Sequence, residues 1–229
     1  SVMKYDPKNP DYTQRDRFIL SKGHAAIVQY AAMAEVGFFD KALLNSFKKL
    51  GSPLQGHPDR LKLPGIEVGT GSLGQGLSIS VGMALALKLN RIDSNVYCLM
   101  GDGEIAEGQI WEAAMAAKNY HLNNLIGIVD KNNLQATGTI EERFNTNPLP
   151  DKWISFGWKV VEINGHDFNE ILEAFKEAKE NTLSPTLIIA DTIKGKGISF
   201  AENNPGYHNI QFTKEQYEEA LMELKGEAI

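Results

Sequence analysis

Two short segments carry residues that could bind a divalent cation together with a diphosphate. Gly101-Asp102-Gly103 follows the apolar run 96–100, and Asn132-Asn133 comes shortly after the apolar run 125–129. A carboxylate and an amide carbonyl are hard oxygen ligands, which suit Mg²⁺ when a diphosphate, a backbone carbonyl and water complete its coordination. Glycines beside the aspartate let the backbone approach a phosphate closely. A lone Gly-Asp-Gly is more often a surface turn, so the interpretation depends on both segments having the right structural context.

That context is a βαβ unit. The two apolar runs have the length of buried strands, and residues 108–120 between them have helical spacing. Because the carboxyl ends of parallel strands lie side by side, we expect Asp102 and Asn132 to meet at one edge of the sheet. The following helix would point the positive end of its dipole at a bound anion.

The same pattern of strands and helices extends along the chain. We expect strands at 18–20, 158–163 and 186–190, and helices at 25–36, 41–50, 77–89 and 213–224. Asp167 and Glu170 predict a capping box before a further helix. Residues 51–76, 138–151 and 194–207 are expected to be loops. The class is therefore α/β, with a mostly parallel sheet flanked by helices.

Composition narrows the function classes. The 229 residues, 42% of them hydrophobic, suit one domain, here 1–229, with a loop and helical arm over 195–229. A net charge of −6 without a basic stripe argues against nucleic-acid binding. We expect no membrane span, and the single cysteine, Cys98, favours a reducing, cytoplasmic location. The opening residues resemble the end of an element, so we expect the natural chain to start upstream.

A glycine-rich segment raises a competing hypothesis. Residues 69–74 match the dinucleotide fingerprint G-x-G-x-x-G, which requires a preceding strand and an acidic residue at the end of the next strand. Here the preceding residues 63–68 are interrupted by proline and glycine, and Asp93 precedes the next strand rather than ending it. NAD binding is therefore disfavoured.

Taken together, the motifs resemble those of the transketolases. They occur in the family's order and at similar spacing: SKGHAA (21–26), QGHPD (55–59), GTGSLGQG (69–76), GDGEIAEGQIWEA (101–113), DKNN (130–133), FGW (156–158), TIKGKGISF (192–200) and YH (207–208). The match is to the N-terminal region, which binds the diphosphate of thiamine diphosphate. The resemblance implies a thiamine-diphosphate-binding fold and the N-terminal subunit of a split, two-chain transketolase.

The resemblance also implies roles for individual residues. Mg²⁺, for which Ca²⁺ or Mn²⁺ could substitute, would be held by the side chains of Asp102 and Asn132 and the backbone carbonyl of Leu134. The cofactor would be bound by a set drawn from five motifs: His24, Gly71, Ser72, Leu73, Gly103, Asn132 and Lys194.

Three histidines are implied to be catalytic, namely His24, His57 and His208. Imidazoles exchange protons with hydroxyl groups near neutral pH. His24 would lie against the cofactor, and His57 and His208 would face the sugar. Glu107 and Glu112 resemble acidic residues at the interface between active sites, although they could be ordinary surface charges early in a helix.

The implied reaction transfers a two-carbon ketol unit from a ketose phosphate to an aldose phosphate, as in the pentose phosphate pathway. The carbanion chemistry belongs to the cofactor, and the protein orients and polarises the reacting groups. The glutamate that activates the aminopyrimidine belongs to a pyrimidine-binding domain. We therefore expect a partner, the C-terminal transketolase subunit, in an α2β2 heterotetramer that is inactive without it.

The chain departs from the family pattern in two places. A further family histidine lies in an SGHPG-like segment that would precede residue 1. The family usually has glycine after its last histidine, where this chain has Asn209, which puts the aim of His208 in question.

Other functions compete with this interpretation. An α subunit of a 2-oxo-acid dehydrogenase carries a similar Gly-Asp-Gly to Asn pattern, but not SKGHA, QGHPD and GSLGQG. Deoxyxylulose-phosphate synthase shares some motifs but is a longer single chain. A non-catalytic cofactor-fold protein would have no physical need to keep the Asp102/Asn132 pair. His121 and His166, outside the matched motifs, are expected to be ordinary polar residues, and Trp111 and Trp153 to be packing residues.

Overall fold

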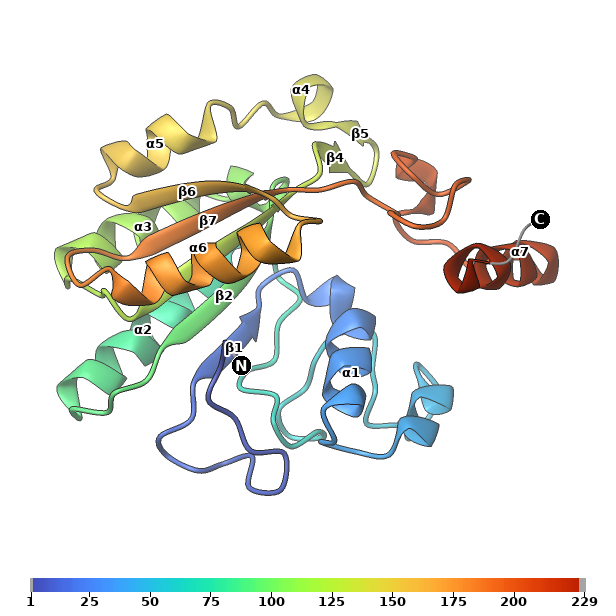
Figure 1. Cartoon of the computed structure of the whole chain (residues 1–229), viewed down its shortest axis with the longest axis horizontal. Coiled ribbons are helices and arrows are strands. Elements are labelled where there is room, and N and C mark those ends of the chain that lie inside the picture. The colour runs from blue at the N-terminus through green and yellow to red at the C-terminus, as the bar shows by residue number, and fades with distance from the viewer. Residues whose placement is uncertain (1, 227–229) are drawn as a thin grey trace.

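A parallel five-stranded sheet organises the chain in the computed structural model, which describes residues 2–226 (Figure 1). In spatial order its strands are β1 (Arg17–Leu20), β2 (Val96–Gly101), β3 (Leu125–Lys131), β7 (Thr186–Asp191) and β6 (Lys159–Asn164). Every neighbouring pair in the sheet is parallel. The predicted α/β class with a mostly parallel sheet is confirmed.

Helices cover both faces of the sheet. On one face, α2 (Gln75–Leu89), α3 (Gly108–Asn119) and α5 (Leu149–Ser155) enclose the largest core cluster, and α6 (Phe168–Glu180) packs on the other face. Small buried residues, among them Ala84 and Ala114, let α2 and α3 pack closely together. Trp153 is fully buried and contacts the rings of Trp111 and Trp158, so both predicted packing tryptophans have that role.

Two regions lie beside the sheet. Helix α1 (Ala26–Glu35) packs with a short 3₁₀ helix (Lys41–Ser46) around a separate small core. Helix α7 (Lys214–Lys225) forms an arm that lies away from the sheet, at the right of Figure 1. Glu223 of α7 accepts hydrogen bonds from the backbone and hydroxyl of Ser199, and Gln216 donates to Tyr207. These contacts fasten the arm to the loop that precedes it.

Three local predictions differ from the structure. The helix expected over 41–50 is a six-residue 3₁₀ helix, since Phe47 has an extended ψ of 128° and Gly51 a φ of 81°. The loop expected over 138–151 contains the hairpin strand β5 (Gly138–Thr139), α4 (Ile140–Arg143) and the start of α5. A Thr139–Glu142 capping box starts α4 and is readable in the sequence. Strand β4 (Leu134–Gln135) pairs with β5.

The third difference concerns the capping box predicted at Asp167 and Glu170. Asp167 does cap α6, by accepting from the backbone N–H groups of Asn169 and Glu170. The Glu170 side chain instead accepts from the backbone N–H of Asn164, at the end of β6. It therefore ties the helix to the strand before it.

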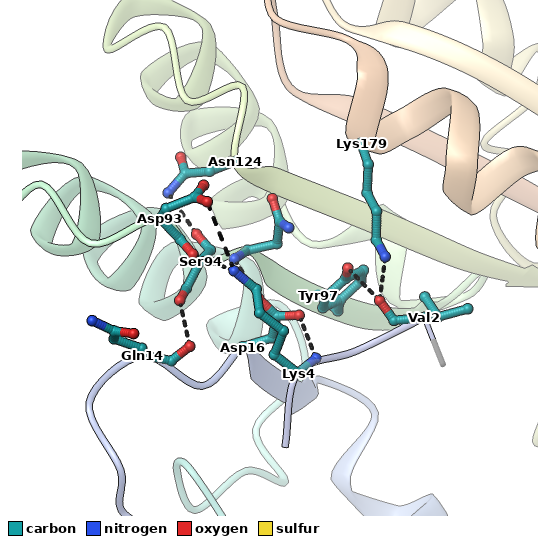
Figure 2. Close-up of polar contacts among 10 residues, drawn as sticks. Val2, Lys4, Gln14, Asp16, Asp93, Ser94, Tyr97, Asn124 and Lys179 are labelled. Atoms are coloured by element: carbon teal, nitrogen blue, oxygen red, sulfur yellow. Dashed lines mark hydrogen bonds and ion pairs between the residues drawn. The ribbon is translucent and has the colours of Figure 1, made fainter. Parts of the chain in front are cut away.

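The segment before β1 is fixed to the amino end of the sheet by polar contacts (Figure 2). The buried Asp16 carboxylate accepts from the backbone N–H of Lys4 at 2.8 Å and of Asn95 at 2.7 Å. The carbonyl of Val2 accepts from the Lys179 ammonium and, at 3.4 Å, from the Tyr97 hydroxyl. These contacts join the first residues to β2 and α6.

No helix within residues 2–226 is long and apolar enough to cross a membrane. Cys98 is buried in β2, and burial raises the pKa of its thiol to about 12, so the thiol stays protonated.

Candidate active site at the carboxyl end of the sheet

The βαβ unit brings the two predicted ligand segments together. Strands β2 and β3 are paired so that Gly101 lies opposite Asp130, and the loops that follow them leave the same edge of the sheet. The backbone N–H of Asn133 donates to the Asp102 carboxylate at 2.5 Å. Asp102 and the Asn132 turn are therefore adjacent in space although they are far apart in sequence.

The turn after β3 has a shape that directs its side chains. Asn133 has a φ of 60°, a left-handed conformation that asparagine tolerates better than most residues. The Asn132 side-chain oxygen accepts from the backbone N–H of Leu134 at 3.1 Å. The turn 132–134 thus contacts the Asp102 carboxylate through the Asn133 N–H, and Asn132 and Leu134 line the same cavity as Asp102.

A cavity of about 630 Å³ opens at this edge. Eight of the residues predicted for the site line it, and they come from six segments of the chain: His24, Leu73, Asp102, Gly103, Asn132, Leu134, Lys194 and His208. The structure therefore assembles most of the predicted set in one place.

Three predicted residues do not line this cavity. Gly71 and Ser72 precede Leu73 on the segment that leads into α2, and His57 is exposed beside them. A Cβ on Gly71 would lie 2.9 Å from the His57 ring, so the imidazole rests on that glycine. His57 also contributes to lowering the His24 pKa, which places it next to the cavity rather than in its wall.

Asp102 is buried and carries no counter-charge of its own. Its two oxygens accept from the backbone N–H groups of Gly103 and Asn133, and within residues 2–226 it forms no ion pair. Burial raises the pKa of Asp102, partly offset by these two hydrogen bonds. A buried carboxylate in a cavity wall that also contains Asn132 and Leu134 has the charge and the oxygen donors to fit a divalent cation.

Asp130 is a carboxylate with the opposite character. It is paired with the Lys22 ammonium and accepts from the Thr192 hydroxyl. Burial works against its ionisation, but Lys22, Thr192 and Asn132 together lower its pKa. Asp130 is therefore satisfied within the protein and serves to hold Lys22 in the cavity wall.

Lys194 is the cavity cation that has no ion-pair partner within the described residues. Burial and the neighbouring Lys22 lower its pKa, while Asp130 and Asp102 act in the opposite direction. Its position and free charge fit it for a diphosphate, to which an ammonium binds as a point charge.

The rings of His24 and His208 are in contact, with centroids 5.2 Å apart, and both residues line the cavity. Burial, followed by His208, Lys22, Lys194 and His57, lowers the pKa of His24 to about 4. Burial, Lys194 and Lys22 also lower the pKa of His208. Both imidazoles are therefore neutral at physiological pH, and His208 Nδ1 is a buried polar atom without a protein hydrogen-bond partner among the described residues.

The departure at Asn209 leaves the local backbone unstrained. Asn209 is absent from the described non-glycine residues with positive φ, so its position does not require the freedom of glycine. His208 itself has helical angles, at the end of a short 3₁₀ helix (Pro205–Tyr207). The doubt about the aim of His208 therefore has no basis in the backbone.

Two glycines allow the loops to approach each other. A Cβ on Gly23 would lie 2.6 Å from the Thr70 backbone, and one on Gly76 would lie 2.3 Å from the Ser21 hydroxyl. Both distances are below any real contact, so the SKGH and GTGSLG segments meet only because these positions lack side chains.

Sequence reasoning missed other parts of the wall. Lys22 and Asp130 lie inside the motifs SKGHAA and DKNN, so their motif membership was an available signal. His166, taken as an ordinary polar residue, lines the cavity and accepts from the backbone N–H of Ile193 at 2.8 Å. Its Nδ1 therefore carries the proton in the neutral ring, and it supports the segment that presents Lys194.

The N-terminus of helix α2 lies against a carboxylate of the protein itself. Helix α2 starts at the GTGSLG segment, and its N-cap Gly74 donates to the buried carboxylate of Glu104 at 2.8 Å. Within the described residues no strand occupies positions 51–74, so the dinucleotide fingerprint also lacks the strand it needs. The α2 N-terminus is occupied by a protein carboxylate.

Comparison with known proteins decides the family. The profile of the family described as transketolase, thiamine diphosphate binding domain, matches residues 1–224. The chain belongs to the transketolase family.

The similar proteins also indicate which part of a transketolase this is. The chain is 44% identical to an apulose-4-phosphate transketolase subunit of Phocaeicola vulgatus, over 97% of this chain and 79% of the relative. It is 45% identical to the 6-deoxy-6-sulfo-D-fructose transketolase subunit SqwG of Clostridium sp., over 99% and 82%. It is thus an N-terminal subunit of a transketolase.

Solved structures agree on the fold. The transketolase of Campylobacter jejuni superposes with a TM-score of 0.91 at 37% identity, over 98% of this chain and 36% of that one. The chain spans about a third of such single-chain transketolases. The alternative of a 2-oxo-acid dehydrogenase subunit or a non-catalytic relative is not favoured.

Proposed function

We propose that this chain holds the diphosphate end of thiamine diphosphate through Mg²⁺ and, with a C-terminal partner subunit, transfers a two-carbon ketol unit between sugars. In this proposal residues 1–229 act as one cofactor-binding domain in the reducing cytoplasm. The observation that carries it is the buried Asp102 carboxylate, which has no ion-pair partner among the described residues and lines a cavity of about 630 Å³ together with Asn132.

The cavity residues would bind different parts of the metal and cofactor according to their charge. Asp102, Asn132 and the Leu134 carbonyl would hold the metal, Lys194 and the Gly103 backbone would face the diphosphate, and Leu73 would contact the cofactor rings. Gly71 and Ser72 would contribute through their backbone, at the margin of the cavity. When bound, the cofactor supplies the carbon that accepts and releases the ketol unit.

The histidines would handle the protons of the sugar. A neutral imidazole can accept a proton from a sugar hydroxyl, and the low pKa of His24, about 4, keeps it in that form. The Nδ1 of His208 is buried and has no hydrogen-bond partner among the described residues, so it would pair with a substrate hydroxyl once the ring turns toward the cavity. His57 would act from the margin of the site, next to Gly71.

The names of two relatives support a proposal for the substrate class. Their names specify apulose-4-phosphate and 6-deoxy-6-sulfo-D-fructose, both sugars with an anionic substituent. We therefore propose a ketose with a terminal anionic group as donor, an aldose of the same class as acceptor, and a place in pentose phosphate or related sugar metabolism.

The partner would complete the site. Relatives that are named as one subunit of a transketolase imply a second one, and we propose that it provides the pyrimidine-binding domain in an α2β2 heterotetramer. Two exposed apolar side chains of α1 would lie in the footprint of this partner: Ile27, 46% exposed, which lines the cavity, and the next residue, Val28, 58% exposed.

Calorimetric titration of thiamine diphosphate tests the proposal. The titration is made with and without Mg²⁺, into this chain alone and into its mixture with the C-terminal subunit encoded nearest to it. Tight, Mg²⁺-dependent binding and ketol transfer by the mixture alone are expected. Robust ketol transfer by the isolated chain would contradict the partner requirement, and no binding in either sample would contradict the site.

A further inference from the structure

We propose that Glu104 is a positioning residue, whose buried carboxylate holds the three cofactor-facing loops in fixed relation to one another. The proposal rests on the proposed function, since it concerns how the same cavity is built. It goes beyond it because Glu104 neither lies among the predicted site residues nor is needed as a ligand.

The carboxylate of Glu104 joins three motifs that are far apart in sequence. Its Oε1 accepts from the Gly74 backbone N–H at 2.8 Å and from the Ser21 hydroxyl, and its Oε2 accepts from the Gly101 backbone N–H at 3.1 Å. Ser21 begins SKGHAA, Gly74 belongs to GTGSLGQG and Gly101 begins GDGEIAEG. One side chain thus connects the segments that carry His24, Leu73 and Asp102.

The Glu104 carboxylate is buried at the wall of the cavity, and no cation of the described residues pairs with it. Glu104 is 2% exposed and Ser21 is 0% exposed, and within residues 2–226 Glu104 forms no ion pair. Its negative charge is instead stabilised by three hydrogen bonds and by the N-terminus of the fifteen-residue helix α2, which Gly74 caps. A buried carboxylate in such a setting is costly unless all its acceptors are used, so the geometry is strongly constrained.

We call the Glu104 carboxylate and its three donors, Ser21, Gly74 and Gly101, the clasp. Its position in the chain explains why it affects the site. Glu104 is two residues beyond Asp102, and it starts the short 3₁₀ helix Glu104–Ala106. Fixing Glu104 therefore fixes the turn that presents the Asp102 carboxylate and the Gly103 backbone. On the other side, Ser21 is three residues before His24, so the same carboxylate sets the distance between the metal-ligand turn and the histidine.

The test compares Glu104→Gln with two other variants of the full chain. An amide retains one oxygen acceptor but presents N–H groups where Glu104 has its second acceptor, so one loop is released with little change in volume. Ser21→Ala removes the hydroxyl that donates to the clasp. Glu180→Gln, at an exposed position in α6, is the matched control for the loss of one carboxylate.

Two readouts separate positioning from general stability. Amide hydrogen exchange without cofactor is expected to rise about tenfold or more at Gly74 and Gly101 in Glu104→Gln, and to stay unchanged in α6. Affinity for Mg²⁺–thiamine diphosphate, measured with the partner subunit present, is expected to fall about tenfold or more. Ser21→Ala in the Glu104→Gln background should add less than it costs alone, because the two act as a unit.

The outcomes distinguish failure of the clasp from failure of the proposed function. Unchanged exchange at Gly74 and Gly101 would overturn the proposal, whatever the affinity. Faster exchange with unchanged affinity would also overturn it, because Glu104 would then hold the loops together without affecting how tightly the cofactor binds. Should wild-type protein fail to bind the cofactor even with the partner, the proposed function fails, while the exchange result still decides whether Glu104 joins the loops.

Discussion

The two ends of the sheet use buried carboxylates in opposite ways. At the amino end, Asp16 accepts from two backbone N–H groups and fixes the first residues against β2 (Figure 2). At the carboxyl end, Asp102 also accepts from two backbone N–H groups, yet its pKa is raised and it faces a cavity. Lys194, in the same wall, has no ion-pair partner in the described part of the chain. The Asp16 carboxylate fastens the chain, whereas at the carboxyl end Asp102 and Lys194 stay without ion-pair partners among the described residues, beside the Lys22–Asp130 pair, as a site for a cation and an anion requires.

The largest expected effect is at Asp102. Asp102→Ala should abolish Mg²⁺-dependent binding of thiamine diphosphate, because it removes the anionic metal ligand. Titration calorimetry of the complex with its partner measures the loss, and Asp102→Asn, which keeps the shape without the charge, should fail as well. Affinity equal to that of the wild type in either variant would eliminate Asp102 as a ligand.

A smaller loss of affinity is expected at Lys194. Lys194→Ala should weaken thiamine diphosphate binding by about 10- to 100-fold, which corresponds to about 1.4 to 3 kcal/mol for a charged contact to a phosphate. Lys196→Ala is the control, since Lys196 is exposed and pairs with Glu202 outside the cavity. Equal losses for the two lysines would indicate a general charge effect rather than a contact.

The amino end should respond in stability and not in binding. Asp16→Ala leaves the backbone N–H groups of Lys4 and Asn95 without their acceptor, so the free energy of unfolding should fall by about 1–3 kcal/mol. Cofactor affinity of the folded protein should not change. Denaturant unfolding and calorimetry measure the two quantities, and a parallel loss of affinity would show that the two ends are not independent.

The smallest effect concerns acid pH. The pKa of His24 is about 4 in the folded chain, below the ordinary value of 6.5, so the unfolded chain binds more protons between these pH values. His24 therefore contributes to loss of stability as the pH falls from 6.5 to 4, and His24→Gln should reduce that loss. Titration of the imidazole signals by NMR gives the pKa directly, and a value near 6.5 would refute the assignment.

Helices, strands and site residues were predicted best where the spacing of apolar residues and the position of a motif indicated the same structure. The strands on both sides of α3 and the meeting of Asp102 with Asn132 followed from periodicity and from the geometry of parallel strands. The prediction of a loop over 138–151 was wrong because α4 and α5 are short. Local signals mark where they start, and neither helix is long enough to show a repeating pattern of apolar residues.

Contacts between distant segments could not be predicted from the sequence. Nothing in the spacing shows that Glu104 accepts from Ser21 and Gly74, or that His166 supports the Lys194 segment, because each contact depends on how separate loops pack. The roles given to Glu107 and Glu112 stay predictions. Both are exposed, at the start and on the surface of α3, where a partner could reach them.

The missing side chains of Gly23 and Gly76 set a limit on how this sequence can vary. Neither glycine has space for even a methyl group, because each faces the backbone or side chain of the neighbouring loop. In a library of random single substitutions, both positions should tolerate replacement as poorly as Asp102 does, although neither supplies a functional group. A map of mutational tolerance would therefore outline the joint between two loops as clearly as it outlines the chemistry.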